Sequence, residues 1–190
     1  MKVVLLGCNR KSEVLHRYID DKYCECTSEK IGAQFKTKVE TFVGTSVKVQ
    51  VWGESFSFDS FLCLSHCSRV KCVFLTDVAC STKMSSILKS YIKGAAAIVL
   101  VYDVTDRPSF EKDMPDLLEF IEKNAAPNVI KTAIGCRCED LDRRVIRQSD
   151  AEELFTRHQM SCYEVSAKTG KGVADFFRDI AEIYISRTPY

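Results

Sequence analysis

Two kinds of hydrophobic pattern alternate along this chain. Short apolar runs, rich in β-branched residues, predict strands at 2–6, 70–75, 95–102, 129–134 and 162–165. Apolar residues at helical spacing predict helices at 13–23, 81–93, 110–123, 149–158 and 173–186. Two strand-like segments, 35–43 and 47–52, flank Gly44-Thr45-Ser46 and predict a hairpin. Alternating strands and helices predict an α/β fold, a doubly wound and mostly parallel sheet of six strands with about five helices.

The first predicted strand ends at Gly7, and a shortened phosphate-binding loop follows it. In the pattern G-x-x-x-x-G-K-[ST], backbone N–H groups face the phosphates, the Lys reaches the outer phosphates and the hydroxyl holds Mg²⁺. Gly7, Lys11 and Ser12 are present, but Arg10 stands where the second glycine is expected. Lys11 follows Gly7 by four positions, whereas the pattern has six. We therefore expect a tight turn that is too shallow for a diphosphate.

Composition narrows the class of protein. A chain of 190 residues is long enough for one domain with a full core, so we expect a single domain over 1–190. The net charge of +1 gives no electrostatic reason to expect a nucleic-acid partner. No apolar run reaches the roughly 18 residues of a spanning helix, and no cysteine near Tyr190 is placed for a prenyl group. We expect a cytoplasmic protein without a direct lipid anchor.

The ten cysteines allow two interpretations. Without a secretory signal, reduced thiols at buried strand positions are expected, and no disulfide bonds. The alternative is a metal or redox site, for which the nearest cluster is Cys63, His66, Cys67 and Cys72. Cys8 lies beside a helix N-terminus, where a thiolate would be stabilised, but a buried inert thiol is the preferred interpretation.

Several stretches together resemble the Rab branch of the Ras superfamily of small GTPases. They occur in the family's order from end to end, and they are Ile31–Lys38, Val47–Trp52, Ser90–Ala95, Val101–Asp106, Pro127–Lys131 and Glu164–Gly170. The resemblance implies the small G-protein fold, binding of GTP or GDP with Mg²⁺, and protein partners that contact the switch surface. It also implies a role in membrane traffic.

Carried over residue by residue, the resemblance names a candidate nucleotide site. Gly7, Lys11 and Ser12 would contact the phosphates, Ser12 and Asp77 would serve Mg²⁺, and Glu139 with Ser166, Ala167 and Lys168 would hold the base. Each has a plainer alternative. Lys11 can be a solvated residue in the first turn of a helix, Ser12 an N-cap, and Asp77 the end of a strand. Ser166 to Lys168 can be kept for turn geometry alone.

The chain differs from the family at the motifs that bind the nucleotide and Mg²⁺ and that catalyse hydrolysis. The base-reading motif Asn-Lys-x-Asp falls on Cys136 to Glu139, and a thiol cannot replace an amide that both donates and accepts. The threonine that closes on Mg²⁺ falls at Lys30. The motif Asp-x-x-Gly fits either directly after Trp52 or at Asp77–Cys80, with Ser81 in place of the catalytic Gln. We prefer the second position, which makes 53–76 an inserted strand or loop, predicted at one edge of the sheet.

Three functions remain open. The first is a pseudo-GTPase, a protein-binding module that keeps the fold but binds GTP poorly. The second is an atypical GTP-binding switch with slow hydrolysis, and the third is a cysteine-based redox or metal module. Hydrolysis needs positioning, Mg²⁺ and an oriented water together, and parts of all three are missing. We therefore do not expect GTP hydrolysis, and we prefer the first function.

Overall fold

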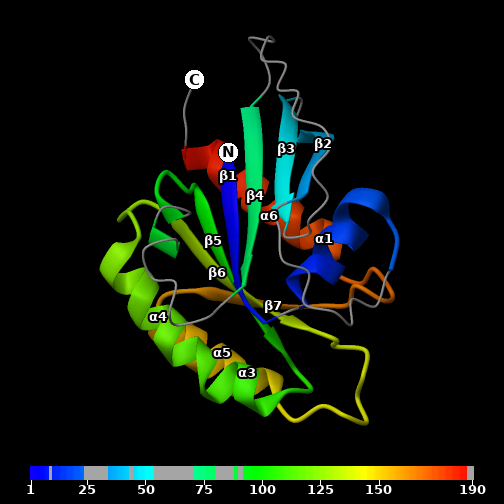
Figure 1. The fold of residues 1–190 in the computed structure, drawn as a ribbon, viewed down its shortest axis with the longest axis vertical. Helices are drawn as coiled ribbons and strands as arrows, with labels where there is room; N and C mark the ends of the chain where they lie inside the picture. Colours follow the sequence, from blue (N-terminus) through cyan, green and yellow to red (C-terminus); the bar gives the residue numbers. More distant parts are fainter. Residues whose placement is uncertain are drawn as a thin grey trace.

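The computed structural model describes residues 1–8, 10–23, 34–42, 45–53, 71–79, 88–89 and 92–187. Its strands are β1 (Lys2–Gly7), β2 (Gln34–Phe42), β3 (Thr45–Gly53), β4 (Lys71–Ala79), β5 (Ala97–Asp103), β6 (Ile130–Cys136) and β7 (Ser161–Val165). Its helices are α1 (Lys11–Asp20), α3 (Arg107–Glu111), α4 (Asp113–Asn124), α5 (Gln148–Arg157) and α6 (Val173–Arg187). The predicted α/β fold class is confirmed (Figure 1).

All seven strands belong to one sheet, in the order β2-β3-β4-β1-β5-β6-β7. Only β2 and β3 pair antiparallel, as the predicted hairpin, and the other neighbours pair in parallel. The central position of β1 and β5 was predicted from their uninterrupted apolar runs, and every residue of β5 is buried.

The inserted segment corrects two predictions. All seven predicted strand segments belong to the sheet, where six were expected to, and the strand of the insertion, β4, lies inside the sheet between β3 and β1, not at one edge. β4 pairs in parallel with both neighbours, over Lys2–Gly7 on one side and Val47–Trp52 on the other. An inner position satisfies the backbone N–H and C=O groups of a strand on both sides, which an edge position does not.

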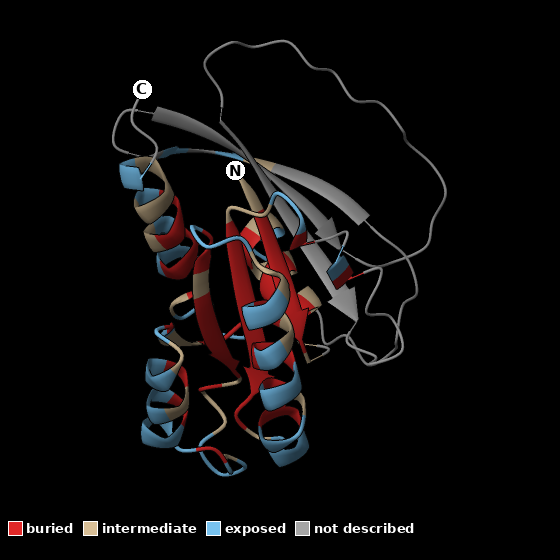
Figure 2. Cartoon of the chain, turned by 90° about the vertical axis from the view of Figure 1, so that its left-hand side faces the viewer, coloured by how far each residue is buried: buried red, intermediate tan, exposed pale blue. Residues whose placement is uncertain are grey.

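Helices cover both faces of the sheet. On one face α1 and α6 pack on Val3, Leu5 and Val99, and Tyr18 of α1 stacks on Phe177 of α6 at 4.0 Å between ring centroids. On the other face α3, α4 and α5 pack on Val4, Leu6 and their neighbours in β5. Figure 2 shows the buried central strands between these two layers. Alternate residues of β1 thus belong to different cores, as the period of two in a strand requires.

Two helix predictions are adjusted by the structure. The helix expected at 110–123 is two helices, α3 and α4, that meet at Lys112, and Pro108 lies at the start of α3, where a missing N–H costs nothing. Of the helix expected at 81–93, residues 88, 89 and 92 are helical and the greater part lies outside the described residues.

Candidate functional site

The carboxyl ends of three parallel strands bring together residues that are far apart in the sequence. β1 ends at Gly7, β5 at Asp103 and β6 at Cys136, and Asp103 and Cys136 are register partners. β4 ends beside them, with Ala79 opposite Gly7. Ligand sites in open α/β sheets lie at this edge, so the candidate functional site is here.

Gly7 is required by its own geometry. Its φ is +125°, and a Cβ placed on it would lie 2.0 Å from the carbonyl oxygen of Val101 in β5. The N–H of the next residue, Cys8, donates to that same oxygen at 2.9 Å. The chain therefore leaves β1 pressed against β5, in a path that only glycine can follow.

Hydrogen bonds join the described residues on either side of Asn9, which itself lies outside the described residues. The Lys11 ammonium donates to the carbonyl oxygens of Gly7, at 2.8 Å, and of Cys8, at 2.9 Å, and the Lys11 N–H points to Cys8 O at 3.5 Å. Lys11 is 2% exposed, so the alternative of a solvated lysine is wrong. Ser12 is the second residue of α1 and not its N-cap, which is Arg10.

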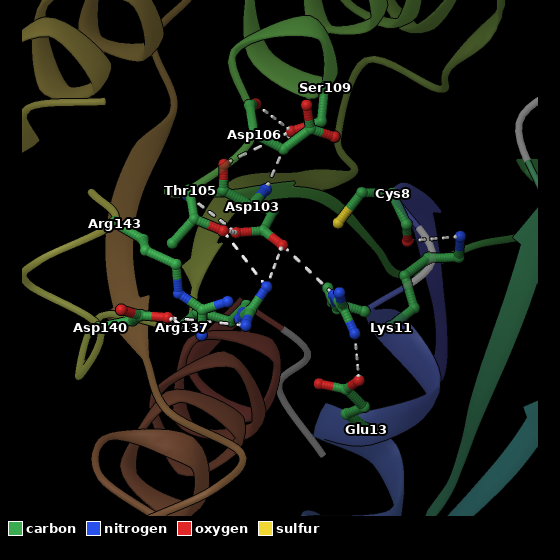
Figure 3. A network of polar contacts seen from close by, with 11 residues as sticks. Cys8, Lys11, Glu13, Asp103, Thr105, Asp106, Ser109, Arg137, Asp140 and Arg143 are labelled. Carbon is green, nitrogen blue, oxygen red and sulfur yellow. Dashed lines mark hydrogen bonds and ion pairs between the residues drawn. The ribbon is translucent and has the colours of Figure 1, made fainter. Parts of the chain in front are cut away.

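Asp103 is the centre of a polar network at this edge (Figure 3). Its Oδ1 accepts the N–H of Thr105 at 2.8 Å and the Thr105 hydroxyl at 2.6 Å. Its Oδ2 lies 3.6 Å from Arg137 Nη1, and its backbone N–H donates to Ser109 Oγ at 3.1 Å. Asp103 is only 4% exposed, so these contacts replace the water that a charged carboxylate needs.

Arg10 joins this network to the first turn of α1. Its Nε donates to Asp103 Oδ2 at 3.2 Å, and its Nη1 donates to Glu13 Oε1 at 2.6 Å. Sequence reasoning missed Glu13, Asp103 and Arg137 as members of this site. One signal was available, since Asp103 ends the strongest apolar run of the chain and Glu13 falls in the first turn after the loop.

The loop Ser166–Lys168 is built as a tight turn on the same edge. Ser166 is fully buried, and its hydroxyl accepts the N–H of Thr169 at 3.0 Å, while the N–H of Gly170 donates to Ser166 O at 2.8 Å. Arg17 of α1 donates to the carbonyl oxygens of Ala167 at 2.6 Å and of Lys168 at 2.9 Å. These contacts fix the loop to α1, and the base-backing role of Ser166, Ala167 and Lys168 stays a prediction.

Cys136 and Glu139 stand in the base-reading motif, and their side chains have different surroundings. Cys136 is 2% exposed, and burial raises the pKa of its thiol well above the ordinary value. Glu139 keeps an unused acceptor, because its Oε2 is buried and has no hydrogen-bond partner among the described residues. A buried carboxylate oxygen without a donor is costly, so this atom is suited to a ligand that donates an N–H.

Asp77 lies in β4 with Leu5 as its register partner in β1. The strand continues to Ala79, so Asp77 does not end it. The backbone of Asp77 is thus beside β1, and the Mg²⁺ role of Ser12 and Asp77 stays a prediction. Other residues that the sequence singled out lie outside the described residues, namely Lys30, Cys63, His66, Cys67, Cys80 and Ser81.

Four cysteines are described by the structure, and each is a free thiol: Cys8, Cys136, Cys138 and Cys162. Burial raises the pKa of Cys8 to about 12 and that of Cys162 to about 11, so neither is a thiolate near neutral pH. Among the residues described, no group of three or more His, Cys, Asp or Glu side chains is arranged to hold a metal ion.

A guanine nucleotide fits this edge only in part. On the phosphate side, the N–H groups of Cys8 and Lys11 and two donor directions of the Lys11 ammonium are directed at protein carbonyls. These particular donors are therefore directed at protein atoms, whereas a phosphate-binding loop directs such donors at phosphate. On the base side, Glu139 Oε2 fits an N–H donor, whereas the buried Cys136 thiol offers nothing that an amide would.

Comparisons with known proteins agree on one family. The model of the Ras family matches residues 58–185. The chain is 30% identical to Ras-related protein Rab-10 of Caenorhabditis elegans over 190 residues, which cover 99% of this chain and 82% of that protein. It is also 30% identical to Ras-related protein Rab-1 of Theileria annulata, over 95% of this chain and 72% of that protein.

A third relative is GTP-binding protein YPT1 of Saccharomyces cerevisiae, 30% identical over 182 residues, or 95% of this chain and 76% of that protein. In the part of the chain that the structure describes, no helix is long and apolar enough to cross a membrane. One assignment follows from the mostly parallel sheet, from a family match over most of the chain and from relatives that match nearly all of this chain. The chain belongs to the Ras family of small GTPases and is close to the Rab branch.

Proposed function

We propose that this chain is a pseudo-GTPase, a protein-binding module that has kept the Rab scaffold and lost the nucleotide switch. One observation carries the proposal: the Gly7–Lys11 turn is closed by bonds from the Lys11 ammonium to Gly7 O and Cys8 O and from the Cys8 N–H to Val101 O. A phosphate would have to break these bonds before it could use the same donors. The buried thiol of Cys136 in the base-reading motif supports the same conclusion.

The biological role that we propose follows the family. Rab relatives suggest a place in membrane traffic or signalling, in the cytoplasm, with protein partners that contact the surface equivalent to the switches. Without a nucleotide switch, such partners would recognise one permanent conformation and would not respond to GTP.

A second candidate function is an atypical GTP-binding switch with slow turnover. The unused Oε2 of Glu139 favours it, because this oxygen lies in the motif that would face the base. In that case Ser166, Ala167 and Lys168 would back the base, Lys11 would contact phosphate, and Ser12 with Asp77 would serve Mg²⁺. The Lys11 ammonium has three N–H donors, and two of them are directed at the carbonyl oxygens of Gly7 and Cys8.

Titration with fluorescent GTP and GDP in excess Mg²⁺ tests the choice, with yeast YPT1 as the positive control. We expect no saturable binding in the sub-micromolar range and no preference for guanine over adenine nucleotides. Sub-micromolar affinity that GDP competes away and ADP does not would refute the pseudo-GTPase proposal and favour the switch. In that event Lys11→Ala decides where the phosphates sit, since loss of binding would place them at this turn.

A further inference from the structure

Two buried carboxylates meet at the carboxyl edge of the sheet. Glu13 in the first turn of α1 is 2% exposed, and Asp103 at the end of β5 is 4% exposed. A carboxylate taken out of water costs several kcal/mol unless cations and hydrogen bonds replace the solvent. Two of them at one edge also repel each other, so the folded chain needs a cation between them.

Arg10 is the residue that contacts both. Its Nη1 lies 2.6 Å from Glu13 Oε1, and its Nε lies 3.2 Å from Asp103 Oδ2. Burial by itself would lower the pKa of the Arg10 guanidinium, but the hydrogen bond and charge of Glu13, together with Asp103, raise it. One planar guanidinium can direct different N–H groups at two carboxylates, which a lysine ammonium on a flexible chain does less well.

Two more arginines take part in the described ion pairs at this edge. Arg137 lies 3.6 Å from Asp103 Oδ2 and 3.6 Å from Asp140 Oδ2, and Arg143 lies 2.5 Å from the same Asp140 oxygen. The guanidinium groups are those of Arg10, Arg137 and Arg143, and the carboxylates are those of Glu13, Asp103 and Asp140. Within these ion pairs, three guanidinium groups meet three carboxylates, and the buried ammonium of Lys11 lies at the same edge on the carbonyl oxygens of Gly7 and Cys8.

We infer that Arg10 is an internal cation that holds the turn, α1 and β5 together, so that this edge folds without a bound ligand. The inference rests on the proposed function, because it explains how the fold is kept once the nucleotide is lost. It also assigns a reason to the residue that stands where the loop pattern has glycine. The side chain of Arg10 connects elements that a ligand at this edge would otherwise connect.

Thermal unfolding of Arg10→Ala tests the inference, with Arg178→Ala as the matched control. Arg178 also pairs with a carboxylate three residues away, Asp175, at 2.9 Å, but both side chains are more than half exposed. We expect Arg10→Ala to lower Tm by several degrees, on the order of 5 °C, because it leaves Glu13 and Asp103 without their shared cation. Arg178→Ala should change Tm by about 1 °C or less.

Glu13→Gln completes the test as a double-mutant cycle. If Arg10 acts by neutralising Glu13, adding Glu13→Gln to Arg10→Ala recovers part of the lost Tm, and Arg10→Lys loses less than Arg10→Ala. A purely steric role for Arg10 would give additive losses and no recovery. Equal Tm for Arg10→Ala and Arg178→Ala would also overturn the inference.

The outcome of this double-mutant cycle is independent of nucleotide binding. All measurements use nucleotide-free protein, checked by absorbance of the denatured supernatant, so the cycle reports only on the ion pairs. Sub-micromolar GTP binding would refute the proposed function while leaving a positive cycle intact. If the cycle shows no coupling between Arg10 and Glu13, and GTP does not bind, then only the role of Arg10 is refuted.

Discussion

At the scale of single residues, the atoms that surround a residue decide its role more than its type does. Gly7 is a family-like glycine, but the structure gives it a local reason, since β5 leaves no space for a side chain there. Lys11 is the residue type that contacts phosphate in the loop pattern, but here its ammonium is buried and donates to the carbonyl oxygen of Gly7. The same residue types can thus serve a nucleotide or replace it, depending on which atoms they reach.

Gly7→Ala is expected to destabilise the fold by about 3 kcal/mol, because the new Cβ would require β1 and β5 to separate. Gly94→Ala is the matched control, since Gly94 also has positive φ, +71°, but has nothing within 4 Å of the added Cβ. Its cost should be limited to backbone strain, about 1–2 kcal/mol. Denaturant unfolding measures both, and equal losses would show that contact with Val101 is unimportant.

The raised pKa of the Cys8 thiol predicts a loss of stability at alkaline pH. Its pKa is raised from 9.0 to about 12 in the folded state, so folding favours the protonated thiol. The stability that this contributes is complete below pH 9 and is lost as the pH rises towards 12. Between pH 8 and pH 10 the free energy of unfolding should fall by about 1 kcal/mol more in wild type than in Cys8→Ala. Parallel pH profiles would contradict the prediction.

At the scale of elements, hydrogen bonds between segments position the edge. Arg17 links α1 to the Ala167–Lys168 backbone, and Arg144 binds both carboxylate oxygens of Glu164 in β7, at 2.6 and 2.7 Å. Neither contact is visible in a local sequence pattern, because 150 residues separate Arg17 from Ala167. These contacts hold the loops after β6 and β7 whether or not a ligand is present.

Removing the Arg17 side chain is expected to loosen the 166–170 turn. Arg17→Ala deletes the two charge-assisted bonds to the turn, at Ala167 O and Lys168 O, together with the bonds to Asp21, and should cost about 2 kcal/mol. The N–H of Gly170, which donates to Ser166 O, should then exchange with solvent faster. Arg157→Ala is the control, because its partner Glu153 is exposed and on the same helix. Unchanged exchange at Gly170 would mean that the turn is stable by itself.

At the scale of the whole molecule, the strand of the inserted segment lies between the β2–β3 hairpin and β1. β4 separates β3 from β1, so the β2–β3 hairpin lies one strand further from the Gly7 turn, roughly 4.8 Å. The segment beside β1 is therefore Lys71–Ala79, and the position of the Asp-x-x-Gly motif at Asp77–Cys80 stays a prediction. The proposed function predicts that the stability of the fold is also independent of metal.

The Tm of the whole protein should therefore not respond to EDTA or to millimolar GDP with Mg²⁺. A ligand that binds only the folded state at 100 times its Kd adds about 2.7 kcal/mol, which would raise Tm by several degrees. Scanning fluorimetry measures the shift, with YPT1 treated in the same way. A rise of several degrees with GDP but not ADP would contradict the prediction.

The sequence by itself determined the fold class, the hairpin, the central β1 and β5 and the shortened loop, because these follow from local periodicity and spacing. Tertiary structure alone decided that β4 lies inside the sheet, that Lys11 turns back on Gly7 and Cys8, and that Arg10 joins Glu13 to Asp103. The physical reason is distance along the chain. Strand order and ion pairing depend on which segments meet in space, and Arg10 and Asp103 are 93 residues apart.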